Sequence, residues 1–191
     1  MKLLIPLTAI AVISIGTTYA ADTNVVNDVQ HNANQQQRIE QGLQSGQLNT
    51  REAGRLERQE SRIDRTEKRD LRDGDMSAGE QRRLTARQNK VSRNIYRQKH
   101  DAQTGNPDSA SSRRMQADVQ RNANQQERIA QGAETGQLSN REVAGRERGQ
   151  ARVNRHEANA AADGHVGPVE QDGIQRSENR QSRRIFRKKH N

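Results

Sequence analysis

The chain has no cysteine and no tryptophan, and its 191 residues include only two tyrosines and one phenylalanine. Without cysteine it can form no disulfide, use no thiol nucleophile and carry no lipid on a cysteine side chain. The lack of aromatics disfavours the stacking surfaces with which proteins read single-stranded nucleic acid. No serine sits in a nucleophile elbow, and none of the five histidines pairs with another at helical spacing, so we expect no enzymatic activity.

Large apolar residues are also scarce. After residue 20, leucine, isoleucine, valine and phenylalanine make up 22 of 171 residues, which leaves partial disorder as an alternative to a folded domain. Most of the remainder is arginine, glutamate, glutamine and alanine, all of which favour helices. The sequence therefore predicts an all-α protein with long charged helices and a marginal core.

The only long apolar run is at the start. One lysine precedes an apolar stretch from residue 3 to residue 15, and small residues follow up to Ala20. This order is typical of a secretory signal peptide, and the run is too short to span a bilayer. We predict a signal peptide over residues 1–20, a periplasmic or secreted protein, and no transmembrane segment.

The rest of the chain is a tandem duplication. Residues 28–100 align without a gap to residues 118–190, and 33 of the 73 positions are identical. The segment between the copies is rich in glycine, proline, asparagine, aspartate and serine, as flexible linkers are. We predict helical repeats over 21–100 and 115–191, joined by a linker over 101–114.

Each repeat divides into three predicted helices, which in the first copy lie near residues 27–44, 50–72 and 78–100. Glycine marks each break, and Asn49, Ser77 and Ser139 each precede a glutamate by three residues, the spacing of a capping box. Leu84, Val91 and Ile95 form a narrow apolar seam. Short breaks favour antiparallel packing, so each repeat should be a roughly three-helix unit.

The glycine loops also resemble the second half of an EF-hand loop. Gly74, Met76 and Glu80 have the spacing of its central glycine, hydrophobic position and final glutamate, and three other loops share this pattern. The resemblance implies calcium as the only cofactor candidate. The first half departs from the family, since the first ligand position of this loop is Arg69. The candidate calcium ligands are Asp70, Asp73, Asp75, Glu80, Asn159, Asp163 and Glu170. The alternative is that each loop is a helix stop followed by a capping box.

Basic residues dominate the third helix of each repeat. The candidate polyanion-binding residues are Arg82, Arg83, Lys90, Arg93, Arg97, Arg176, Arg180, Arg183 and Arg187. The last four project within about 60° of one another at helical spacing, and arginine binds phosphate and carboxylate groups bidentately. The second helix, near 50–72, alternates acids and bases, which predicts a solvated face that neutralises itself. These patterns favour binding to an anionic polymer or lipid surface, and make sequence-specific nucleic-acid binding improbable.

A third function comes from another resemblance. Leu84-Thr85-Ala86-Arg87-Gln88 matches the LTxxQ signature of periplasmic stress chaperones of the Spy type. That resemblance implies binding of unfolded proteins, but the second repeat lacks the motif. Polyanion binding is therefore the first hypothesis, with a calcium-binding module and a chaperone as alternatives.

Overall fold

The computed structural model describes residues 21–189, and the predicted signal peptide lies outside them. The described part of the chain is all-helical, as predicted. Its six helices are α1 (Thr23–Gln44), α2 (Thr50–Asp70), α3 (Ala78–Lys99), α4 (Ala110–Glu134), α5 (Asn140–Ala160) and α6 (Pro168–Lys189). None of these helices is both long enough and apolar enough to cross a bilayer.

The helix boundaries follow the local sequence signals. Asn49 and Ser77 are the N-cap residues of α2 and α3, and each forms a capping box. The N-cap side chain accepts a hydrogen bond from the backbone amide of the glutamate three residues later, and the carboxylate of that glutamate accepts one from the backbone amide of the N-cap residue. The glycine in each short break has a positive φ, between 70° and 102°, which other residues rarely adopt. These signals confirm the predicted three-helix division of each repeat.

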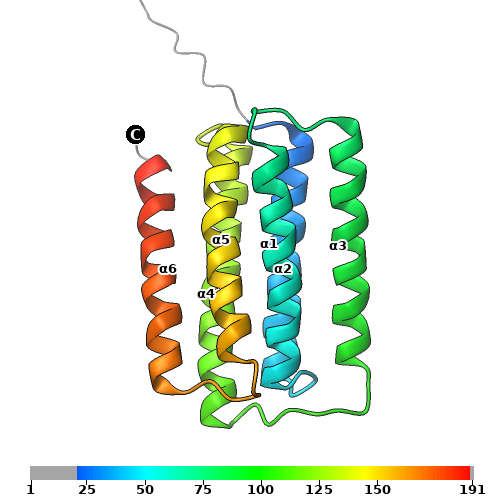
Figure 1. Cartoon of the computed structure of the whole chain (residues 1–191), viewed down its shortest axis with the longest axis vertical. Coiled ribbons are helices and arrows are strands. Elements are labelled where there is room, and N and C mark those ends of the chain that lie inside the picture. The colour runs from blue at the N-terminus through cyan, green and yellow to red at the C-terminus, as the bar shows by residue number, and fades with distance from the viewer. Residues whose placement is uncertain (1–20, 190–191) are drawn as a thin grey trace, which may run out of the picture.

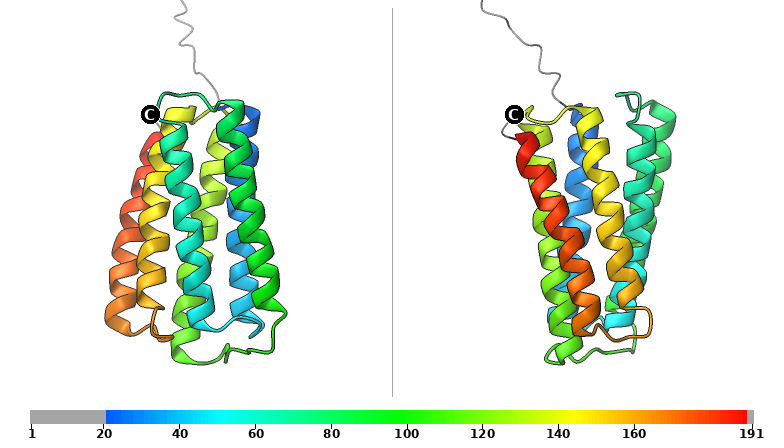
Figure 2. Two further views of the ribbon diagram at one scale, coloured as in Figure 1. Left: turned by 45° about the vertical axis from the view of Figure 1, so that its right-hand side comes forward. Right: turned by 60° about the vertical axis from the view of Figure 1, so that its left-hand side comes forward.

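Successive helices alternate in direction along the long axis of the molecule (Figure 1). The most extensive contacts join α2 to α5 and α1 to α4, so the two repeats interlock instead of standing apart. Helix α3 packs on α1 and α2, while α6 packs on α4 and α5 (Figure 2). The result is a central four-helix bundle flanked by one helix from each repeat.

The two repeats are related by an approximate two-fold axis. Ser61 Oγ of α2 donates to the carbonyl oxygen of Ala151 in α5 at 2.9 Å, and these two residues occupy equivalent positions in the two copies. Gln37 and Glu127, also equivalent, hydrogen-bond between α1 and α4. Contacts between equivalent residues are expected where a two-fold axis passes between two copies.

The apolar core is divided between the repeats. One buried cluster brings Leu56 and Ile63 of the first repeat together with Met115 and Ile174 of the second, and the other unites Val25 and Val29 with Leu138 and Ile185. Each repeat therefore covers apolar side chains of the other. This sharing lets a chain with few large apolar residues bury those it has.

The segment between the repeats lies against the turn that joins α1 to α2. The amide of Gly105 donates to the carbonyl oxygen of Gly46 at 2.8 Å, and a Cβ on Gly105 would come within 2.5 Å of the carbonyl oxygen of Leu48. Helix α4 begins at Ala110, so residues 110–114 of the predicted linker belong to that helix.

Candidate functional site

Helix α2 separates its charges by sign, and the prediction of a self-neutralising face is wrong. Glu57, Glu60, Asp64 and Glu67 all point into the bundle and are at most 1% exposed. The arginines between them lie on the exposed face. Two ion pairs are found among the described residues, Arg69 with Asp70 and Arg121 with Glu178. Arg55, Arg58, Arg62 and Arg65 of α2 take part in neither pair and lie exposed to solvent.

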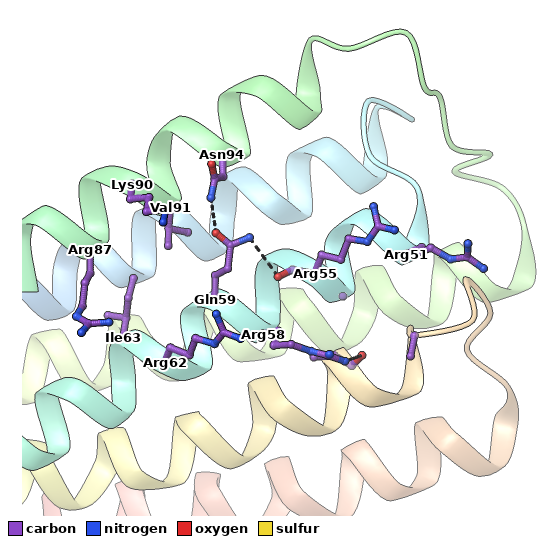
Figure 3. A pocket seen from close by; sticks show the side chains of 13 residues that line it. Arg51, Arg55, Arg58, Gln59, Arg62, Ile63, Arg87, Lys90, Val91 and Asn94 are labelled. Carbon is purple, nitrogen blue, oxygen red and sulfur yellow. Dashed lines mark hydrogen bonds between the residues drawn. The ribbon is translucent and has the colours of Figure 1, made fainter.

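These arginines line a groove between α2 and α3, with a volume of about 620 Å³ (Figure 3). Its cationic residues, which we call the arginine groove, are Arg51, Arg55, Arg58, Arg62, Arg87 and Lys90. Ile63 and Val91 contribute apolar surface, and Ala158 and Ala162 of the second repeat also line it. None of the described residues that line the groove is acidic.

The two repeats differ at one residue beside this groove. Gln59 of α2 projects between the helices, donates to the carbonyl oxygen of Arg55 at 3.3 Å and accepts from Asn94 of α3 (Figure 3). The equivalent residue of the second repeat is Gly149. A Cβ there would lie 1.7 Å from Oε1 of Gln181, so the glycine allows α6 to place a side chain directly against α5. The glutamine instead keeps a polar spacer between α2 and α3.

Two of the groove arginines also bond to backbone oxygens of the second repeat. Arg51 Nη2 donates to the carbonyl oxygen of Asp163 at 2.6 Å, and Arg58 Nη2 to that of Ala158 at 3.5 Å. Neutral carbonyl oxygens hold a guanidinium in place without cancelling its charge. These two cations are therefore oriented and still available to an anion.

The structure places the predicted polyanion-binding residues in two separate regions. Lys90 lies in the arginine groove, and Arg93 and Arg97 line a shallow hollow beside Tyr96 on the same helix. Arg82 and Arg83 are exposed near the start of α3. The remaining four, which we call the α6 stripe, are exposed on the opposite side of the bundle: Arg176, Arg180, Arg183 and Arg187 (Figure 1).

The predicted calcium ligands of the first repeat are engaged in local contacts. Asp70 pairs with Arg69 at 2.8 Å, Asp73 Oδ1 accepts from the amide of Asp75 at 3.3 Å, and Glu80 accepts from the amide of Ser77 at 3.0 Å. The carbonyl oxygen of Asp73 accepts from Arg141 of the other repeat at 2.7 Å.

The second repeat shows the same arrangement. Asp163 Oδ1 accepts from the amide of His165 at 2.8 Å, Glu170 accepts from the amide of Gly167 at 2.8 Å, and Asn159 is exposed near the end of α5. Arg51 bonds to this loop as Arg141 does to the other. Calcium binding at these loops stays a prediction, and the cation would have to compete with a guanidinium at each.

The LTxxQ residues take part in packing α3 against α1. Leu84 is fully buried, and Gln88 Nε2 donates to the carbonyl oxygen of Asp28 at 3.1 Å and to Oδ1 of Asn32 at 2.9 Å. Gln88 thus satisfies polar groups inside the bundle.

Comparisons with protein-family models, with curated proteins and with solved structures find no match to this chain.

Proposed function

We propose that the protein is a non-enzymatic, exported basic binding protein that holds an anionic polymer in the arginine groove. The observation that carries this proposal is the set of six cations lining one groove with no carboxylate among them. Arginine guanidinium groups bind phosphate and carboxylate through paired hydrogen bonds.

The shape of the groove favours a polymer over a single small anion. Arg51, Arg55, Arg58 and Arg62 follow one another along a 12-residue stretch of α2, and the first and last are separated by about 16 Å of helix. Successive anionic groups of a chain molecule can meet successive arginines over such a length. Two helices wall the groove, so a strand can enter it, whereas a flat lipid surface would reach only its rim. The α6 stripe would offer a second, weaker contact.

The test compares two variants with the same loss of charge. The groove variant is Arg55→Gln/Arg58→Gln/Arg62→Gln, and its matched control in the α6 stripe is Arg176→Gln/Arg180→Gln/Arg183→Gln. We expect the groove variant to bind fluorescently labelled long-chain polyphosphate on the order of tenfold or more weakly, as measured by fluorescence anisotropy. The stripe variant should lose much less affinity.

Equal losses in the two variants would show that net charge attracts the polymer and that the groove is not the site. Circular dichroism at 222 nm serves as the folding control. Because all six substituted arginines are exposed, both variants should keep the helical signal of the parent protein.

A further inference from the structure

Acidic side chains are buried inside the four-helix bundle formed by α1, α2, α4 and α5, whose helices are seen in Figure 2. Glu57, Glu60, Asp64 and Glu67 of α2 face Glu147 and Glu157 of α5, and all six are at most 1% exposed. Carboxyl groups are rarely buried without partners because removing their charge from water is costly. Such a concentration in a small core requires a compensating interaction.

Three of these carboxyls converge at one end of the cluster. Asp64, Glu67 and Glu147 each bring an oxygen within 4.8 Å of the other two. A cation with carboxylate ligands at about 2.1–2.4 Å keeps any two ligand oxygens within about 4.8 Å of each other. The spacing of the three oxygens therefore fits a single ion between them.

Amide side chains hold these carboxyls from outside. Asn32 Nδ2 donates to both oxygens of Glu67 at 2.9 Å, Gln126 Nε2 donates to Glu147 Oε2 at 3.3 Å, and Asn154 Nδ2 donates to Asp64 Oδ2 at 2.9 Å. Hydrogen bonds of this kind orient the ligands of metal sites, and they leave other lone pairs free.

The unpartnered oxygens provide a second, independent indication of a ligand. No hydrogen-bond donor of the described residues reaches Asp64 Oδ1, Glu147 Oε1 or either oxygen of Glu60, although all are buried. Glu60 lies one turn before Asp64 on the same face of α2. The Arg38 side chain, the positive charge that most favours ionised Glu60, donates its hydrogen bonds to Ser92. Without a bound cation, these oxygens could accept a hydrogen bond only from a neighbouring carboxyl group that carries a proton.

The duplication shows that this end differs from its counterpart. Under the two-fold relation, Glu67 and Glu147 correspond to Glu157 and Glu57, which form a similar pair at the other end. In that half, however, Asn154 takes the place of Asp64, and Gln150 the place of Glu60. At these aligned positions of α2 and α5 one end thus has four carboxyls and the other two, with Glu178 of α6 close to Glu157 at that second end.

We propose that Asp64, Glu67 and Glu147, with Glu60 beside them, bind one hard divalent cation of the magnesium, manganese or calcium class inside the bundle. All the donors are oxygens, the ligand type that these cations prefer, and no histidine or cysteine belongs to the cluster. Facing helices of a four-helix bundle commonly build metal sites in this way. The site is distinct from the glycine loops and from the arginine groove.

The experiment uses Mn²⁺ as the probe on protein first stripped with chelator. Binding is followed by the loss of the electron paramagnetic resonance signal of free Mn²⁺, and the melting temperature (Tm) by circular dichroism. We expect one Mn²⁺ per chain, a higher Tm with the ion, and release of protons on binding in weakly buffered solution. A chain that binds no Mn²⁺ at millimolar concentration would overturn the proposal, since its carboxyls would then be satisfied by protons alone.

Two variants locate the ion. Asp64→Asn keeps the side chain's shape and introduces the residue that the second repeat already has, so we expect it to fold and to bind Mn²⁺ on the order of tenfold more weakly or worse. Glu60→Gln, matching Gln150, should weaken binding in the same direction. The matched control, Glu157→Gln at the other end, should keep one tight site. Unchanged binding in Asp64→Asn would place the ion elsewhere and contradict the proposal.

Discussion

At the scale of single residues, the direction of each charged side chain of α2 determines its chemistry. Burial raises the pKa of Glu57 to about 8 and the pKa values of Asp64, Glu67 and Glu147 well above their usual range. Hydrogen bonds from Gln36 and Asn32 oppose this shift without cancelling it. In the absence of a bound cation, burial therefore favours the protonated form of these groups.

The raised pKa values predict an unusual dependence of stability on pH. In the unfolded chain these carboxyls ionise near pH 4, whereas in the folded protein the pKa of Glu57 is about 8 and those of Asp64, Glu67 and Glu147 are raised by burial, so the folded state binds more protons above pH 4. The free energy of unfolding should then fall as pH rises from about 4.5 to 8. In chelator, we expect a Tm lower by roughly 5 °C or more at pH 8.5 than at pH 5.

Circular dichroism melts at the two pH values check this prediction. Glu57→Gln removes one of the shifted groups and should flatten the dependence. A Tm that is higher at pH 8.5 would mean that these carboxyls are ionised and paired in the folded state, contrary to their burial.

The spacing of the charged residues in 51–73 already indicated that the acidic and the basic side chains lie on opposite faces of the helix. At 100° per residue, Glu57, Glu60, Asp64 and Glu67 fall within about 80° of one another, and Arg55, Arg58, Arg62 and Arg65 fall on the opposite side. Glu57 and Glu67 are also retained as Glu147 and Glu157 in the second copy, together with their amide partners. The convergence of α2 with α5, which makes these acids a cluster, depends on packing between repeats and could not be inferred from one repeat.

At the scale of helices, two glycines differ in their surroundings: one lies where two helices pack closely, and the other lies on an open helix surface. Gly54 lies where α2 meets α5, and a Cβ there would come within 2.5 Å of the Cβ of Ala161. Gly145 lies on α5 with no atom within 4 Å of its would-be Cβ. Both glycines lie within helices, so substitution by alanine tests a crowded position in one case and an uncrowded position in the other.

We expect Gly54→Ala to destabilise the protein by about 1–3 kcal/mol because the added methyl forces the two helices apart. Gly145→Ala should stabilise it by about 0.5–1 kcal/mol because alanine favours the helix and nothing is crowded. Urea unfolding followed at 222 nm measures both. If both variants gained stability, the close contact between α2 and α5 would be absent in solution.

Capping boxes and glycine breaks predicted the helices themselves within a few residues. Those signals are local, since the residues that cap a helix are its neighbours in sequence. Helix α1 starts at Thr23, four residues before its predicted start, and α4 extends back to Ala110. Neither start shows a capping box, so no comparable local signal marks it.

At the scale of the whole molecule, the protein places many acids inside and most bases outside. Its formal net charge is +9, and protonation of the buried carboxyls makes the folded protein more positive still. The duplication was evident from the sequence, but the interlocking of the repeats was not, because apolar seams do not show which copy they pack against. The arginine groove follows from that arrangement, since residues of both repeats line it.

The salt dependence of polyphosphate binding shows directly whether the exposed arginines of the groove hold an anionic polymer. If the exposed arginines hold the polymer, the logarithm of the association constant should fall linearly and steeply with the logarithm of salt concentration. The groove variant should have a shallower slope, by about one for each arginine removed. Such contacts weaken by orders of magnitude between 50 and 200 mM salt. Binding that does not change over this range would contradict electrostatic binding of the polymer by these arginines.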